Sequence, residues 1–196
     1  TVTSTGAKVS MNAGSGAGHL IRLKNNVTAG DNRVAEFLSP VELIGPVTIK
    51  GQTVSFLSTV DSDSTAARKL TVQTADLGLI EFMGAVGSVH PLQSLTTNNL
   101  GTTRLGADIA VNQLIEINNA TQVAANVKVR SIDNSVIFAG TIDDAAAGSH
   151  DLTVLCNTSA TPANHPSVIF FGNKVGSTAP LRSWLIPLLR LVASDG

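Results

Sequence analysis

The fold is decided by the stretch Val54-Ser-Phe-Leu-Ser-Thr-Val-Asp61 with Leu70-Thr-Val72, which returns 82 residues later as Val136-Ile-Phe-Ala-Gly-Thr-Ile-Asp143 with Leu152-Thr-Val154. The two windows share seven identities in 19 positions, where chance would give about one or two. A long internal repeat indicates that successive parts of the chain bury equivalent apolar side chains in the same way.

The repeat continues downstream at an offset of 89 residues. Eight residues recur there, namely Ile80, Phe82, Val86, Gly87, Ser88, Pro91, Leu92 and Ser94 as Ile169, Phe171, Val175, Gly176, Ser177, Pro180, Leu181 and Ser183. The change in offset predicts an insertion in segment 156–167, which carries Pro162, Pro166 and several polar residues. Such a composition is typical of a surface loop.

Short segments of alternating apolar and polar residues run along the whole chain. Each predicts a strand with one buried face, and Gly, Asn, Asp and Ser between them favour turns. Helical spacing is not sustained before the C-terminus. The clearest such segments are 47–49, 54–56, 70–72, 80–82, 115–117, 127–129, 136–138 and 152–154.

Many short strands fit either an antiparallel sandwich or a parallel β-solenoid, and only a solenoid has a reason to repeat its own sequence. We therefore expect an all-β parallel β-helix forming one domain over 1–196. Coils of about 20 residues would give four coils per repeat and about nine or ten in all. Residues 1–19 would form an N-terminal coil or cap, 20–183 the repeat coils, and 184–196 an apolar cap or contact segment.

Composition excludes several classes of protein. Charged residues are 14% of the chain and the net charge is −1, which argues against a nucleic-acid partner. Aromatic residues are only 4%, so the chain has few side chains on which bases or sugars could stack. The sequence has no apolar run long enough to span a membrane. The single cysteine, Cys156, cannot form an internal disulfide, and we expect it to be an inert thiol.

The repeated strings, together with Phe82-Met-Gly-Ala-Val-Gly-Ser88, Pro91-Leu-Gln-Ser-Leu-Thr-Thr97 and Gly101-Thr-Thr-Arg-Leu-Gly-Ala-Asp108, resemble the tandem repeats of filamentous-haemagglutinin-like and autotransporter-type bacterial surface proteins. The resemblance covers about residues 20–183. It implies a right-handed β-helix, secreted or displayed at the bacterial cell surface, with a structural or adhesive role. It brings no catalytic residues and no cofactor. Two features depart from the pattern: Ser58 replaces a glycine, and the segment Arg182–Val192 does not continue it.

Four acidic residues are candidates for a calcium site, because stacked repeats could bring their carboxylates together: Asp61, Asp63, Asp143 and Asp144. Calcium needs six or more oxygen ligands. The stretch that opens at Asp61 begins like a calcium loop but lacks the central glycine and the final glutamate. Solvated turns that close a coil are the simpler interpretation, and we expect no metal site.

A β-helical polysaccharide lyase or hydrolase is the enzyme alternative. It would combine clustered acids with a basic side chain. Arg68 and Lys69 lie near Asp61 and Asp63, but the second copy replaces them with His150 and Asp151. The four histidines lack metal-binding spacing. We therefore expect a non-enzymatic protein.

The C-terminal segment is strongly apolar. We expect these side chains either to cap the last coil or to contact another subunit, since a solenoid end exposes unpaired backbone groups. Contact with another subunit would build a filament or a surface layer. The partners would then be a protein or glycan surface, or a second copy bound end to end. The residues are Trp184, Leu185, Ile186, Leu188, Leu189, Leu191 and Val192.

Overall fold

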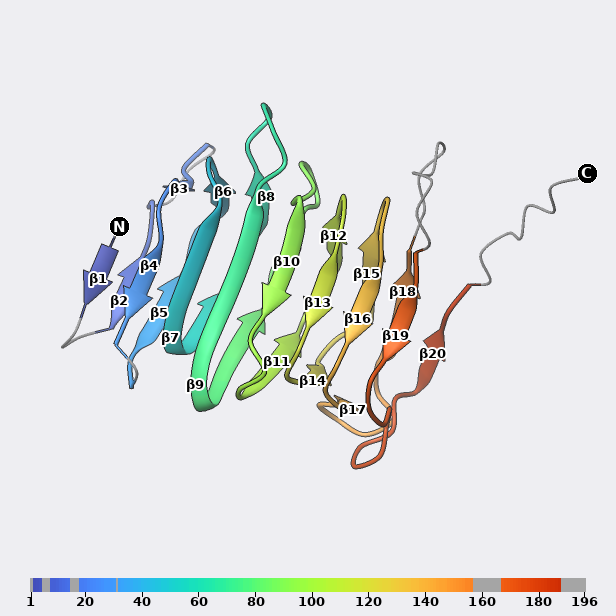
Figure 1. The fold of residues 1–196 in the computed structure, drawn as a ribbon. Coiled ribbons are helices and arrows are strands. Elements are labelled where there is room, and N and C mark those ends of the chain that lie inside the picture. Colours follow the sequence, from blue (N-terminus) through green and yellow to red (C-terminus); the bar gives the residue numbers. More distant parts are fainter. Residues whose placement is uncertain (1, 5–7, 15–17, 31, 157–166, 188–196) are drawn as a thin grey trace, which may run out of the picture.

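The computed structural model describes residues 2–4, 8–14, 18–30, 32–156 and 167–187. This part of the chain contains strands and no helix, and the strands stack in parallel, turn upon turn, as a β-solenoid (Figure 1). The prediction of an all-β parallel solenoid is therefore confirmed. β1 lies at one end of the stack and β20 at the other (Figure 1).

Each turn of the solenoid contributes a strand or bridge to three faces. Face 1 contains β1 (Val2–Ser4), β4 (Val27–Ala29), the first part of β7 (Val47–Phe56) and of β9 (Lys69–Phe82), β10 (Ser94–Thr97), β13 (Ile115–Ile117), β16 (Val136–Phe138) and β19 (Ile169–Phe171). Face 2 contains β2 (Val9–Met11), β5 (Val34–Phe37), the last parts of β7 and β9, β11 (Thr102–Leu105), β14 (Ala120–Val123) and β17 (Ile142–Asp144). Face 3 contains β3 (Ile21–Leu23), β6 (Val41–Leu43), β8 (Val60–Ser62), β12 (Ile109–Val111), β15 (Val127–Ser131), β18 (Asp151–Leu155) and β20 (Ser183–Leu185).

Faces 1 and 2 form one hydrogen-bonded sheet of 13 strands, because β7 and β9 run through the corner between them. Face 3 consists of a three-stranded and a four-stranded sheet. The two sheets are connected by isolated bridges from Val60 to Val86 and from Val86 to Ile109. Every strand pair is parallel, as expected when each turn lies on the previous one in register.

In the described chain face 1 contains eight strands, one from each turn, so the nine or ten coils expected are not confirmed. The turns are longer than the assumed 20 residues: in register, Val47 pairs with Leu70 (70 − 47 = 23) and Leu70 with Leu95 (95 − 70 = 25). The turn that contains the insertion runs from Val136 to Ile169 (169 − 136 = 33). Extra residues at the corners and in this loop lengthen the turns without adding new ones.

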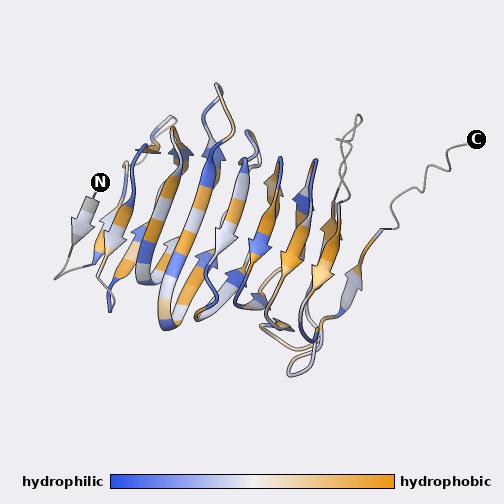
Figure 2. Cartoon of the chain, viewed as in Figure 1, coloured by the Kyte–Doolittle hydropathy of each residue, from blue (hydrophilic) through white to orange (hydrophobic). Residues whose placement is uncertain are grey.

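A narrow apolar core runs through the stack. Along each strand alternate side chains point inward, and Figure 2 shows the resulting alternation of hydrophobic and hydrophilic bands. Phe37, Phe56 and Phe82 are fully buried, and their rings stack at centroid distances of 4.9 and 5.3 Å. Burying each such side chain contributes about 1.5–3 kcal/mol, so the core stabilises every turn through its neighbours.

The two copies of the repeat lie on different faces of the solenoid. Val54 is on face 2 and pairs with Ile80, whereas Val136 is on face 1 and pairs with Ile115. A shift of 82 residues is therefore not a whole number of turns, and the prediction of four stacked coils per repeat is wrong. The physical reason is that a strand on any of the three faces needs the same alternation of inward apolar and outward polar side chains. The same sequence string can therefore form a strand on any face.

A polar seam interrupts the core at the corner between faces 1 and 2. The Asn119 side chain is buried; its Oδ1 accepts hydrogen bonds from the hydroxyls of Thr97 (3.1 Å) and Thr103 (2.7 Å), and its amide donates to the Leu100 carbonyl (3.0 Å). Thr121, also buried, has a hydroxyl without a partner in the part of the chain that the structure describes. The seam therefore contains both satisfied and unsatisfied polar groups.

We expect Thr121→Val to stabilise the protein by about 1 kcal/mol, because valine has the same shape and removes a buried hydroxyl that no described group satisfies. Thr103→Val is the matched control: it should destabilise, since its hydroxyl donates to Asn119. Urea unfolding followed by circular dichroism measures both variants. Equal losses of stability in the two would contradict the assignment.

Candidate functional site

Two of the predicted calcium ligands hold loops of the following turn. Asp61 Oδ1 accepts the backbone N–H groups of Val89 (2.8 Å) and His90 (3.2 Å). Asp143 Oδ1 accepts those of Thr178 (2.8 Å) and Ala179 (3.1 Å). The second pair of donors lies 89 residues after the first, so the repeated sequence builds the same local structure twice. We call segments 87–91 and 176–180 the anchored loops.

Glycine begins each anchored loop for a conformational reason. Gly87 and Gly176 adopt φ angles of 69° and 66°, a left-handed conformation that side chains disfavour. At Gly87 a Cβ atom would also lie only 2.0 Å from the Ala110 carbonyl oxygen. The Val-Gly-Ser and Pro-Leu strings of the repeat thus encode an anchored loop that leaves the core and returns to it.

Asp63 forms an ion pair within its own loop. Its carboxylate accepts hydrogen bonds from Arg68 Nε (2.8 Å) and from a second guanidinium nitrogen of Arg68 (3.0 Å), and from the Thr65 hydroxyl (2.5 Å). The bond to Arg68, reinforced by the one to Thr65, holds the pKa of Asp63 well below its usual range. The carboxylate therefore closes the loop between β8 and β9.

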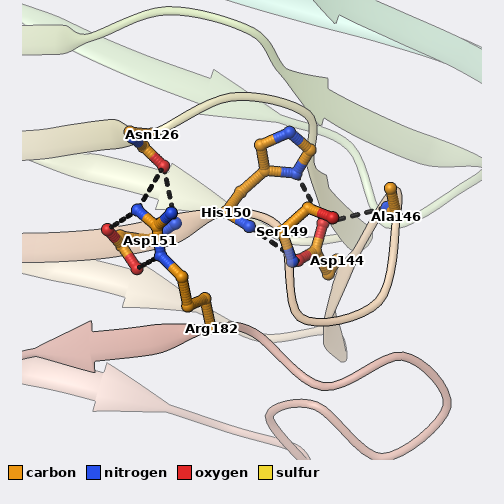
Figure 3. Close-up of polar contacts among 7 residues, drawn as sticks. All are labelled: Asn126, Asp144, Ala146, Ser149, His150, Asp151 and Arg182. Carbon is orange, nitrogen blue, oxygen red and sulfur yellow. Dashed lines mark hydrogen bonds and ion pairs between the residues drawn. The ribbon is translucent and has the colours of Figure 1, made fainter.

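Asp144 lies at an inward position at the end of β17, where the preceding turns have Phe82, Leu105 and Val123. Figure 3 shows its carboxylate enclosed by the loop that follows. It accepts the backbone N–H groups of Ala146, Ser149 and His150, each at 2.9 Å, and lies 2.6 Å from His150 Nδ1. Burial alone would raise the pKa of Asp144, but these hydrogen bonds outweigh it and hold the pKa well below the usual value.

The structure does not bring the four carboxylates together. Asp61 lies in β8 on face 3 and Asp63 in the loop that follows it, whereas Asp143 and Asp144 belong to β17 on face 2. Among the described residues no group of three or more His, Cys, Asp or Glu side chains is placed to hold a metal ion. The alternative in which stacked repeats bring these acids together does not match the structure, because the two copies are on different faces.

Asp151 makes the other prominent polar contact of this region. It forms an ion pair with Arg182 through two guanidinium nitrogens, and Arg182 also donates to Asn126 Oδ1 at 3.3 Å (Figure 3). The hydrogen bonds from Arg182 and Ser183 lower the pKa of Asp151 to about 2. Sequence reasoning missed Arg182 and Asn126, although Arg182 lies at the repeat position of Gln93, whose backbone likewise pairs with the preceding turn.

These environments do not suit acid–base catalysis. A general acid at neutral pH needs a raised pKa, whereas Asp63, Asp144 and Asp151 all have lowered pKa values. Cys156 is buried, and burial raises the pKa of its thiol, which disfavours the reactive thiolate. Asp63, Asp144 and Asp151 instead hold loops and neighbouring turns together.

The Asp144 geometry predicts an acid-dependent loss of stability. A carboxylate whose folded pKa lies below its unfolded value of about 3.9 stabilises the fold above that pH, and the contribution disappears as pH falls toward the folded pKa. At pH 6 we expect Asp144→Asn to cost about 2–3 kcal/mol, because buried N–H groups lose an acceptor. The difference from wild type should shrink from pH 4 to pH 2 in urea titrations. Asp76→Asn, at an exposed corner, is the control; a constant Asp144→Asn difference across pH would refute the assignment.

The predicted C-terminal contact residues are only partly described. Trp184 pairs in register with the buried Leu152, and its ring lies edge-on to Phe171 at 5.9 Å. Trp184 is nevertheless 55% exposed and Leu185 57% exposed, and Ile186 is exposed as well. Leu188, Leu189, Leu191 and Val192 lie outside the described residues. The last described turn therefore leaves core-type side chains accessible.

Fold and loops together define a class of protein, the parallel β-solenoid with internal sequence repeats. Comparison with protein-family models, curated proteins and solved structures finds no match to the chain. In the described part of the chain, no helix has the length and apolar character to cross a membrane.

Proposed function

We propose that this chain is a non-enzymatic structural or adhesive β-helix of the filamentous-haemagglutinin type, secreted or displayed on a bacterial cell surface. The observation that carries the proposal is the parallel solenoid itself, which presents three long faces whose outward side chains form rows from turn to turn. Right-handed winding belongs to the proposal, because parallel strand–crossover–strand connections are overwhelmingly right-handed.

Contacts between adjacent turns along the outer rows support a rigid rod. Ion pairs cross between adjacent turns on the outside, for example Arg22 with Glu42 on face 3 (2.8 Å) and Arg104 with Glu81 on face 2 (3.6 Å). Loops of one turn are anchored to the carboxylates of another. A rigid rod with repeated side faces suits multivalent contact with a surface, in which many weak contacts add up.

Adhesion and turnover assays test the proposal. Beads coated with the folded chain should adhere to host cells or extracellular matrix, and beads coated with unfolded Phe56→Asp protein should not. Equal adhesion of the two preparations would overturn the adhesive role. Turnover of acidic polysaccharides by the purified chain, with or without calcium, would overturn the non-enzymatic assignment.

A subunit that polymerises end to end is the second candidate, and the exposure of Trp184 favours it. The two ends of a parallel solenoid carry matching rows of backbone donors and acceptors, so a second copy can add as a further turn. Such a head-to-tail contact does not close and yields a fibre. Electron microscopy should show long fibres for wild type and short rods for Trp184→Lys. Leu77→Lys, at an exposed corner away from the ends, is the control; isolated wild-type rods would exclude this candidate.

A further inference from the structure

Face 3 contains a hollow beside the first anchored loop. Because the chain leaves the sheet after Val86, this turn contributes only isolated bridges to the face. The hollow, about 330 Å³, is bounded by the loop at Gly87 and Ser88, has Ala110 in its floor, and is lined on its other side by Lys128 and Arg130. Cavities of this size are in the range that binds small ligands.

A second hollow of about 280 Å³ continues along the same face, and the two share Asp108 and Lys128. The second is also lined by Asn126, Asp151 and Thr153. Together they form one groove, which we call the face-3 groove. It runs across the turns that contain β12, β15 and β18.

The groove carries two cations without an ion-pair partner among the described residues. Lys128 and Arg130 lie two positions apart on β15, so their outward side chains start about 6.6 Å apart. In register, Arg130 lies between Ala110 and Leu155, neither of which is charged. Elsewhere on the outer rows Arg22, Arg104 and Arg182 each pair with a carboxylate of a neighbouring turn.

Asp108 is the one acidic residue of the groove that is not already engaged by an arginine. Its Oδ1 accepts the backbone N–H of Lys128 at 2.8 Å, so its negative charge lies at the Lys128 end. The other acid, Asp151, is neutralised by Arg182. With Lys128 and Arg130 counted against Asp108, the groove has a net positive charge, and the Arg130 end is the more positive.

We propose that the face-3 groove binds an acidic, extended peptide segment of a partner protein, with a carboxylate held by Arg130 and Lys128. Arginine binds carboxylates through two parallel hydrogen bonds. The small residues Gly87 and Ala110 allow a peptide backbone to approach the floor closely. The groove is lined by no aromatic side chain, so it offers no stacking surface to a sugar ring, and this favours a peptide over a glycan.

Fluorescence polarisation with a fluorescein-labelled hexaglutamate peptide tests the inference. Wild type should bind the peptide, and Lys128→Gln/Arg130→Gln should bind at least tenfold more weakly. Asp108→Asn should bind more tightly, because a repulsive charge is removed. The matched control is Lys69→Gln/Lys174→Gln, which removes two exposed cations outside the groove and should bind like wild type.

Three results would overturn the inference: no binding of hexaglutamate by wild type, equal binding by wild type and Lys128→Gln/Arg130→Gln, or tighter binding of an oligogalacturonate than of the peptide. The inference rests on the proposed adhesive role of the side faces. Bead adhesion measured in parallel separates the two. Adhesion without peptide binding refutes only the proposal that the groove binds an acidic peptide. Peptide binding without adhesion refutes only the adhesive role.

Discussion

Phe56→Asp should unfold the turns around β7. The side chain is fully buried between Phe37 and Phe82, so truncating it alone costs about 3–5 kcal/mol. Placing an unpaired carboxylate there adds several more kcal/mol. Together these approach or exceed the 5–15 kcal/mol that stabilises a typical domain. We expect loss of the β signal in circular dichroism, or a urea midpoint far below that of wild type.

The control for this prediction is the next residue in the chain. Leu57 lies at the corner between faces 2 and 3 and is 45% exposed, so Leu57→Asp should change the unfolding free energy by less than about 1 kcal/mol. Phe56→Leu provides a variant that keeps an apolar side chain and should fold with a measurable loss. If Phe56→Asp and Leu57→Asp unfold at the same urea concentration, the assignment of Phe56 to the core is wrong.

Asn119→Leu should cost about 3–5 kcal/mol, although it makes the core more apolar. The substitution removes the acceptor of the Thr97 and Thr103 hydroxyls. The Leu100 carbonyl loses one donor but keeps the hydrogen bond from the Thr74 hydroxyl. Each buried donor left without an acceptor costs about 1–3 kcal/mol. Chemical denaturation of the variant measures the loss. An unchanged or increased stability would show that the buried amide is dispensable.

A double-mutant cycle sharpens this second prediction. In wild type, Thr103→Val removes a donor to Asn119 and should destabilise. In the Asn119→Leu background the same change removes an already stranded hydroxyl and should be neutral or stabilising. Additive effects of the two substitutions would mean that Asn119 and Thr103 do not interact.

The calcium hypothesis shows where sequence reasoning reached its limit. The sequence repeat correctly relates Asp61 to Asp143, and the structure shows that both anchor the loop of the next turn. The sequence could not predict which of the three faces each copy of the repeat occupies. Corner residues such as those between Thr74 and Leu79 lengthen a turn. A local sequence pattern does not show how many residues each turn contains, so it cannot predict on which face a repeated string will lie.

The sequence alone determined the all-β class, the parallel stacking and most of the inward positions. Period-two alternation and a long internal repeat can both be seen directly in the order of the residues. The tertiary structure alone decided the length of each turn, the placement of the two copies on different faces, and the groove on face 3. Those features depend on which residues of different turns lie side by side. That pairing is set by the summed lengths of all the intervening corners and loops, rather than by any one segment.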